Sequence, residues 1–242
     1  MANRKNPFWT PWPLPARFNS PPVVERCDLG RGSSLHLCCT QLNDTPAEKK
    51  RILNEWLDYL KSKPRLKTLR IGTRCTQQLF DAACQCSELT SLEIHWGPIT
   101  DLSSIKRLKS LKRLGIGSCS VVNIAPLGQL ASLEHLSLGN FDRTEDYSPV
   151  AKLKQLNRLL IEGAPMMPKS VWMKNLKFLR NLTNLDCLSL TAIKFRDDSF
   201  HKSFRDLNLT WLDLWVDDEE VRQSIIESLP RLRGGRIMES AR

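Results

Sequence analysis

Two stretches in the middle of the chain share one apolar skeleton. Residues Leu108–Cys119 read "LKSLKRLGIGSC" and residues Leu130–Phe141 read "LASLEHLSLGNF". The apolar positions coincide after a shift of 22 residues, whereas almost everything between them differs. Self-similarity at a period of about 20 to 50 residues indicates a repeat architecture. These two stretches therefore suggest that the chain is built from stacked repeats.

The hexamer L-x-x-L-x-[LI] occurs seven times along the chain. The copies begin at Leu66, Leu89, Leu111, Leu133, Leu156, Leu185 and Leu209, with spacings of 23, 22, 22, 23, 29 and 24 residues. One hexamer would fit any amphipathic strand, but seven at nearly constant pitch indicate repeats. "SSLHLC" at Ser33–Cys38 is a degenerate leading copy, and "LPRLRGGRI" at Leu229–Ile237 is a degenerate closing copy.

This pattern resembles the leucine-rich repeat, and the resemblance covers about residues 32 to 237. It implies an α/β solenoid with a curved parallel sheet on the concave face and helices and irregular turns on the convex face. In a strand with a period of two residues, the second and third leucines point inward and the residues between them point outward. Stacked repeats bury these leucines together. We expect one internal row formed by Leu92, Leu114, Leu136, Leu159 and Leu188.

The segments between the hexamers differ along the chain. The central ones, 97–110 and 120–132, are short and resemble internalin-like repeats, although Trp96, Cys119 or Phe141 replaces the asparagine of that pattern. Helices are predicted near the ends, within 45–64, 76–87 and 217–229. For the first helix, Thr45 is the expected N-cap, Glu48 completes a capping box, and Pro64 follows the end. Its predicted buried face consists of Ile52, Leu53, Trp56, Leu57 and Leu60.

The sequence divides into an N-terminal arm, residues 1–31, and a repeat domain, residues 32–242, with about seven to nine repeats. The arm is rich in proline and contains Phe8, Trp9, Trp12 and Phe18. It is either a cap over the first strand, which we favour, or a flexible recognition tail. The long repeat at 163–181 is either a contact loop or core filling, and its apolar set is Met166, Met167, Trp172 and Met173.

Composition restricts the class of protein. The chain has 242 residues, of which 41% are hydrophobic and 26% are charged, as is typical of a folded domain. No apolar run approaches the roughly 18 residues of a membrane span, and prolines interrupt the first 15 residues. We therefore expect a cytoplasmic protein, or a translocated effector without a standard signal peptide. In that compartment the eight cysteines are expected to be free thiols.

No catalytic, metal or cofactor site is predicted. The chain has no Walker loop, no G-x-S-x-G, no H-E-x-x-H and no dinucleotide fingerprint between a strand and a helix. Cys84 and Cys86 in a helix would point apart, so we interpret them, with Cys75, as buried thiols. Three of the four histidines, His36, His95, His135 and His201, fall at outward strand positions, and all four are interpreted as solvent-facing contact residues.

Recognition is predicted on the outward columns of the strands. The candidate partner-binding residues are Arg70, Glu93, His95, Trp96, Arg113, His135, Arg158, Trp211, Asp213 and Trp215. Gly115, Gly117 and Gly139 would leave a flat floor beside the Arg113, His135 and Arg158 row, with the tryptophans as anchors. The alternative is that Trp211 and Trp215 cover the last repeat and the glycines ease tight turns.

These features favour a non-enzymatic protein-binding module. By analogy, it would be a stoichiometric inhibitor or immunity-type protein that neutralises a partner protein, such as one with an acidic surface, through the concave face. The net charge of +10 also permits a nucleic-acid or acidic-surface binder. That alternative is less favoured because the outward columns mix Arg, Glu, His and Asp. A substrate-recognition adaptor or effector is a further alternative.

Overall fold

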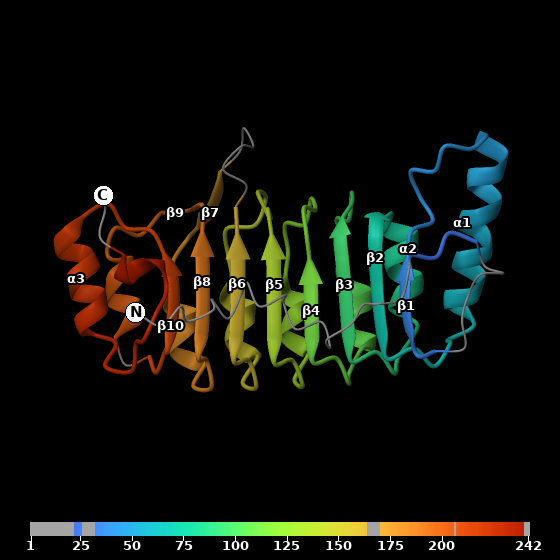
Figure 1. Ribbon diagram of the computed structural model, residues 1–242. Coiled ribbons are helices and arrows are strands. Elements are labelled where there is room, and N and C mark those ends of the chain that lie inside the picture. The colour runs from blue at the N-terminus through green and yellow to red at the C-terminus, as the bar shows by residue number, and fades with distance from the viewer. Residues whose placement is uncertain (1–21, 26–31, 164–169, 206, 240–242) are drawn as a thin grey trace.

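The computed structural model describes residues 22–25, 32–163, 170–205 and 207–239. Eight parallel strands form one sheet, and their order in the sheet follows their order in the chain (Figure 1). The strands are β1 (Ser34–Leu37), β2 (Thr68–Arg74), β3 (Ser91–Trp96), β4 (Arg113–Ile116), β5 (His135–Gly139), β6 (Arg158–Glu162), β8 (Cys187–Thr191) and β10 (Trp211–Leu214). This arrangement confirms the parallel solenoid predicted from the sequence.

The hexamers lie in register across the sheet. Leu114 pairs with Leu92 on one side and with Leu136 on the other, and the row continues through Leu159 to Leu188. All five side chains are at most 1% exposed, so the predicted internal row is confirmed. Since each repeat contributes one leucine to this row, the core extends with every repeat.

The returns between central strands are single 3₁₀ turns, as their shortness and prolines suggested. These turns span Ser103–Arg107, Ala125–Gln129, Ser148–Lys152, Lys177–Asn181 and Phe200–Phe204. They lie behind the sheet in Figure 1, and each places an apolar residue in the core, such as Ile105 or Leu127. The opposite face of the sheet, which we call the concave face, is left for the outward side chains.

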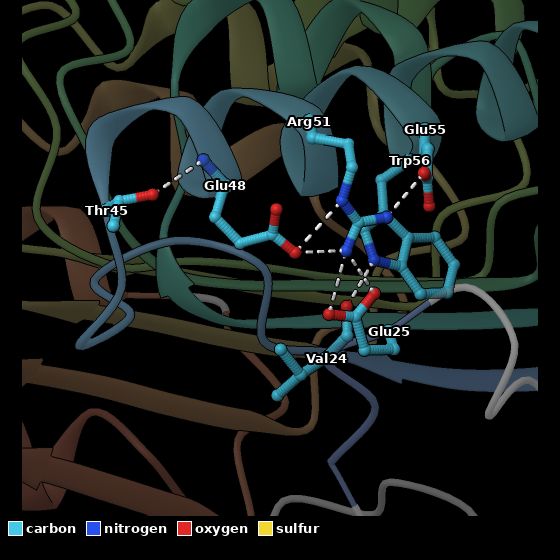
Figure 2. Close-up of polar contacts among 7 residues, drawn as sticks. All are labelled: Val24, Glu25, Thr45, Glu48, Arg51, Glu55 and Trp56. Carbon is cyan, nitrogen blue, oxygen red and sulfur yellow. Dashed lines mark hydrogen bonds and ion pairs between the residues drawn. The ribbon is translucent and has the colours of Figure 1, made fainter.

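Longer helices occur where the sequence predicted them. They are α1 (Pro46–Lys61), α2 (Gln77–Ala83) and α3 (Glu219–Glu227). Thr45 caps α1 by accepting a hydrogen bond from the Glu48 backbone N–H at 3.2 Å. The Glu48 carboxylate accepts from Arg51 instead of reaching back to Thr45, so the predicted capping box is only half formed (Figure 2). On the predicted buried face, Leu53 is partly exposed and the other four residues are buried.

A short piece of the N-terminal arm lies against the first strand. Val23 donates its N–H to the His36 carbonyl at 2.8 Å, and its own carbonyl accepts from the Cys38 N–H at 3.0 Å. The Trp56 indole N–H donates to the Val24 carbonyl at 2.7 Å, and Glu25 pairs with Arg51 at 3.1 Å (Figure 2). Residues 22–25 therefore cover the edge of β1. The arm aromatics Phe8, Trp9, Trp12 and Phe18 lie outside the described residues.

The last strand is covered in a similar way by the segment after α3. Gly234 forms a parallel bridge with Trp211, and its carbonyl accepts from the Leu212 N–H at 3.1 Å. Gly235 has a φ of 114°, and a Cβ there would lie 2.0 Å from the Leu212 carbonyl oxygen. Only glycine fits this position without strain. The closing repeat predicted from the sequence thus continues the backbone pairing beyond β10.

The long repeat adds a second, two-stranded parallel sheet of β7 (Val171–Met173) and β9 (Ile193–Phe195). The chain leaves the main sheet beside Ala192, which has a φ of 53°, and a Cβ on Gly163 would lie 2.1 Å from the Ala192 carbonyl oxygen. Val171 and Met173 are fully buried, whereas Trp172 is partly exposed. The insertion is therefore both core filling and surface. Met166 and Met167 lie outside the described residues.

Candidate functional site

The outward side chains of the concave face form three columns, each running from repeat to repeat. The first column runs through Thr68, Ser91, Arg113, His135, Arg158, Cys187 and Trp211, and the second through His36, Arg70, Glu93, Gly115, Ser137, Leu160, Ser189 and Asp213. The third column lies towards the carboxyl ends of the strands and includes Gly139, Glu162 and Thr191. Because neighbouring strands are about 5 Å apart, these columns form one surface.

A hollow of about 230 Å³ interrupts the columns over strands β3 to β6. We call it the central hollow, and the residues used below are Glu93, His95, Gly115, Gly117, Gly139 and Glu162. The three glycines line it, as expected from the flat floor that the sequence predicted. A neighbouring hollow of about 340 Å³ shares His95, Gly117, Gly139 and Glu162 and reaches Trp96. The two therefore form one depression at the carboxyl ends of the strands.

The glycines of this floor differ in whether the surrounding backbone would accept a side chain. A Cβ on Gly117 would lie 1.8 Å from the His95 carbonyl oxygen, which no side chain tolerates. A Cβ on Gly139 would meet its nearest atom, the Gly117 Cα, at 3.5 Å, which is ordinary contact. Gly117 is therefore required by the close approach of two repeats. Gly139 keeps the hollow open without being required by the backbone.

The rim of the central hollow is acidic. Glu93 lies 3.7 Å from Arg70, measured from Oε1 to Nε, and burial raises the pKa of Glu93 against the lowering effects of Arg70 and His95. Burial also raises the pKa of Glu162, and the charge of Arg236 opposes this. A partly buried carboxylate gains more from a hydrogen-bond donor or cation than an exposed one. The hollow therefore favours donor groups on whatever enters it.

The predicted row of Arg113, His135 and Arg158 is present, since these residues pair across β4, β5 and β6. His135, however, is only 7% exposed. Burial, together with the charges of Arg158 and Arg113, lowers the pKa of His135 to about 4. The expectation of a solvent-facing histidine is therefore wrong at this position. A neutral His135 separates two partly exposed arginines.

At the C-terminal end, two predicted contact residues serve the fold. A Cβ on Gly234 would lie 2.5 Å from Cζ3 of Trp211, so the Trp211 ring packs on the closing repeat, as the alternative interpretation held. Asp213 is 5% exposed and accepts a hydrogen bond from the Arg236 N–H at 3.0 Å. It was expected to face a partner, but it holds the chain's own C-terminal segment. Trp215 remains 54% exposed.

Glu162 was missed by the sequence analysis. The predicted contact residues came mainly from the two positions beside the second leucine of each hexamer, which form the first and second columns. Glu162 directly follows the hexamer that begins at Leu156 and belongs to the third column, where Gly139 is its neighbour. Alternation along the strand would have placed it outward, next to the predicted glycine floor.

Comparisons with known proteins give limited similarity. No family model matches the chain. A Trypanosoma equiperdum protein, whose name describes a regulator of adenylate cyclase, is 32% identical over 133 residues. The match covers 53% of this chain and 19% of that protein, so the chain spans about a fifth of the length of this curated relative.

Solved structures with related shape include two internalins and a leucine-rich repeat protein. An internalin of Listeria monocytogenes is 16% identical with a TM-score of 0.46, covering 72% of this chain and 55% of that one. Internalin C2 of the same species is 21% identical with a TM-score of 0.43, covering 74% and 82%. A leucine-rich repeat protein of Leptospira interrogans is 17% identical with a TM-score of 0.48, covering 88% and 57%. These values are too low to carry a functional argument.

The deciding observation is internal to the chain, because every L-x-x-L-x-[LI] hexamer supplies one strand of a single parallel sheet in register. The chain has the leucine-rich repeat fold. In this leucine-rich repeat chain, no helix of the described residues is long and apolar enough to cross a membrane. Within the same residues, no group of three or more His, Cys, Asp or Glu side chains is placed to hold a metal ion.

The cysteines of the leucine-rich repeat domain are free thiols at all seven described positions, and Cys27 lies outside the described residues. Cys75, Cys84 and Cys86 are fully buried. The helix α2 ends at Ala83, so the pair was not on a helix as expected, but burial was predicted correctly. Burial raises the pKa of Cys86 to about 12. His201 lies in the 3₁₀ turn Phe200–Phe204 and His36 in the second column of the sheet.

Proposed function

We propose that this leucine-rich repeat chain is a non-enzymatic module that binds a partner protein through its concave face. The observation that supports this proposal is the central hollow. Gly139 keeps it open, although the backbone at this position would accept a larger residue. Large side chains surround it, and the rim carries Glu93, Glu162 and the exposed His95. A partner side chain that carries a hydrogen-bond donor or a positive charge would gain most from entering it.

The finer proposal is a stoichiometric inhibitor or immunity-type protein that acts where the chain is made, in the cytoplasm. A single continuous surface suits one-to-one binding, in which a few well-placed residues dominate the affinity. A regulatory role in the name of the Trypanosoma relative is in keeping with such binding, over the 53% of this chain that matches. A nucleic-acid partner is less favoured because phosphates would be repelled by the two glutamates of the rim.

Filling the hollow tests this proposal. The partner would first be captured with the full chain from its native host, identified and purified, and its affinity measured by calorimetry. Gly139→Trp should then weaken binding by about tenfold or more, because the ring occupies the space that the partner needs. A Cβ at Gly139 meets only ordinary contacts, so the native backbone accepts a side chain there, and the melting temperature of the variant is measured to show that it still folds.

A matched control places the same ring elsewhere. Val122 is 57% exposed in the segment between β4 and the 3₁₀ turn Ala125–Gln129 and does not line the central hollow, so Val122→Trp should leave both affinity and stability unchanged. Equal binding by the parent and Gly139→Trp, combined with a loss on charge reversal of Lys106, Lys109 or Lys152, would move the site to the convex side. The concave-face proposal would then be abandoned.

A further inference from the structure

A second depression, of about 490 Å³, lies between the small sheet β7–β9 and the loop that joins β10 to α3. We call it the aromatic groove. Its apolar lining includes Trp172, Phe195, Phe200, Trp215, Val216 and Val221. Its polar lining includes Asp197, Asp198, Asp217, Asp218 and Lys194. None of these residues except Trp215 belongs to the predicted recognition surface, and none lines the central hollow.

Packing within the chain fixes the aromatic wall. The rings of Phe195 and Phe200 stack with centroids 4.3 Å apart and an interplanar angle of 13°. Trp172 already carries cations on its ring, because the Arg196 guanidinium lies 3.9 Å and the Lys194 ammonium 5.4 Å from its centroid. Trp215 is more than half exposed. A wall that is ordered before binding loses little side-chain entropy when a ligand docks.

Three of the four aspartates of the groove are held in place by the chain. Asp197 accepts from the Ser199 N–H at 2.9 Å and from its hydroxyl at 2.7 Å, which lowers the pKa of Asp197. Asp217 accepts from the Trp215 indole N–H at 2.7 Å. Asp218 caps α3 by accepting from the Val221 N–H at 3.0 Å. All these bonds use Oδ1, so Oδ2 of these three carboxylates takes part in none of them.

The charge of this groove is opposite to that of the chain. Four aspartates and one lysine line it, in a protein whose net charge is +10. Asp218 also caps the first turn of α3, so the helix end presents a carboxylate rather than bare N–H groups. Phosphates and acidic segments would be repelled. A ligand that suits the groove must combine positive charge with apolar surface.

We propose that the aromatic groove binds a basic, apolar segment of a partner protein, independently of the central hollow. A lysine or arginine of that segment lies between Asp198 and Asp217, and the neighbouring apolar side chain packs on Trp215 and Phe195. Charge-assisted hydrogen bonds and cation–π contact favour such a residue over a neutral one. Charge complementarity therefore selects the partner segment, and the aromatic wall supplies the apolar contact.

The test uses the full chain and defined probes. Short fluorescent peptides of alternating lysine and leucine, alternating glutamate and leucine, and alternating lysine and glycine would be compared by fluorescence anisotropy at low and high salt. The lysine–leucine peptide should bind saturably and more weakly at high salt. The other two peptides should bind at least about tenfold more weakly. Equal binding of the glutamate–leucine peptide, or no saturable binding of the lysine–leucine peptide, would refute the proposal.

Variants locate the binding. Trp215→Ala should weaken binding of the lysine–leucine peptide about tenfold, because it removes one aromatic ring from the wall of the groove. Asp198→Asn should weaken this binding about threefold, because it removes one negative charge. Asp58→Asn, whose side chain is 81% exposed on α1, is the matched charge control and should have no effect. Gly139→Trp should also leave the peptide bound, which separates this proposal from the proposed function of the concave face. Unchanged binding by Trp215→Ala would overturn the groove assignment.

The chain's own N-terminal segment is another candidate occupant of the aromatic groove, and an experiment can distinguish it from a partner protein. Residues 1–21 carry Arg4, Lys5 and Arg17 and no acidic residue, so this segment has the same chemistry as the expected partner. A full-chain variant with these three residues changed to serine should bind the lysine–leucine peptide no better than the parent. If the probe binds only to this variant, the groove is occupied by the chain's own segment, and the proposal of a separate partner is wrong.

Discussion

Replacing two neighbouring glycines with alanine should have opposite effects on stability. Gly117 and Gly139 occupy equivalent positions just after the second inward residue of β4 and within β5. Among the described residues, Gly235 is the glycine with a positive φ, so alanine is compatible with the backbone dihedrals of both sites. The difference between them is steric. Gly117→Ala should destabilise the protein, whereas Gly139→Ala should not.

The magnitude follows from the contacts of the added methyl group. At Gly117 the Cβ would lie 1.8 Å from the His95 carbonyl oxygen, and real Cβ contacts are essentially never under 3.0 Å. The adjoining repeats must therefore separate, which strains the Gly117 N–H bond to the Ile94 carbonyl at 2.8 Å. Overpacking and one weakened hydrogen bond together cost about 2–4 kcal/mol. At Gly139 alanine restricts the unfolded chain and should stabilise by about 0.4–1 kcal/mol.

Urea unfolding followed by far-ultraviolet circular dichroism measures both effects. The parent and the two variants should share one m-value, and the midpoint should fall for Gly117→Ala and rise slightly or stay constant for Gly139→Ala. The steric account would be refuted if the two variants had equal unfolding free energies, or if Gly117→Ala were as stable as the parent.

Three further predictions concern the core, the thiols and pH. Leu136→Ala should lower the free energy of unfolding by about 2–5 kcal/mol in urea titration, because Leu136 is fully buried in the internal row; a change near zero contradicts that row. Native alkylation with peptide mapping should modify Cys38 before Cys119, since burial raises the pKa of Cys119 to about 12; equal rates contradict this burial. The pKa of His135 is about 4 in the fold against an ordinary 6.5, so unfolding takes up a proton between these two pH values. The contribution of neutral His135 to the free energy of unfolding is complete above pH 6.5 and declines as the pH falls towards 4. In urea unfolding at a series of pH values, His135→Asn should make the free energy of unfolding depend less on pH over this range. An unchanged pH dependence in the variant would contradict the lowered pKa.

The sequence predicts the internal leucine row well, but it does not predict how far neighbouring groups bury the outward side chains. Leucine periodicity placed Leu92 and Leu114 inside because alternation decides which side of a strand a residue faces. The same alternation placed His135 and Asp213 outward, and both are on the expected side. It contains no information on neighbours, and neighbouring arginines and the closing repeat leave these two side chains buried.

The second sheet shows a different limit. The 29-residue spacing marked the repeat from 156 to 185 as unusual, and Trp172 and Met173 were identified as its apolar residues. Pairing of β7 with β9 depends on the turn at Ala192, whose positive φ no sequence rule for alanine would predict. The aromatic groove follows from that pairing. It could not be assembled from sequence because its walls come from three separate segments.

The backbone cover at both ends of the sheet affects how the molecules behave at high concentration. An open strand edge is a template for strand addition by another chain and hence for aggregation. Val23 occupies backbone groups at the outer edge of β1, and Gly234 does so at the outer edge of β10. Within the residues that the structure describes, part of each outer strand edge is therefore already paired when a second molecule approaches. A few backbone hydrogen bonds within each chain therefore disfavour end-to-end pairing of strands between two molecules.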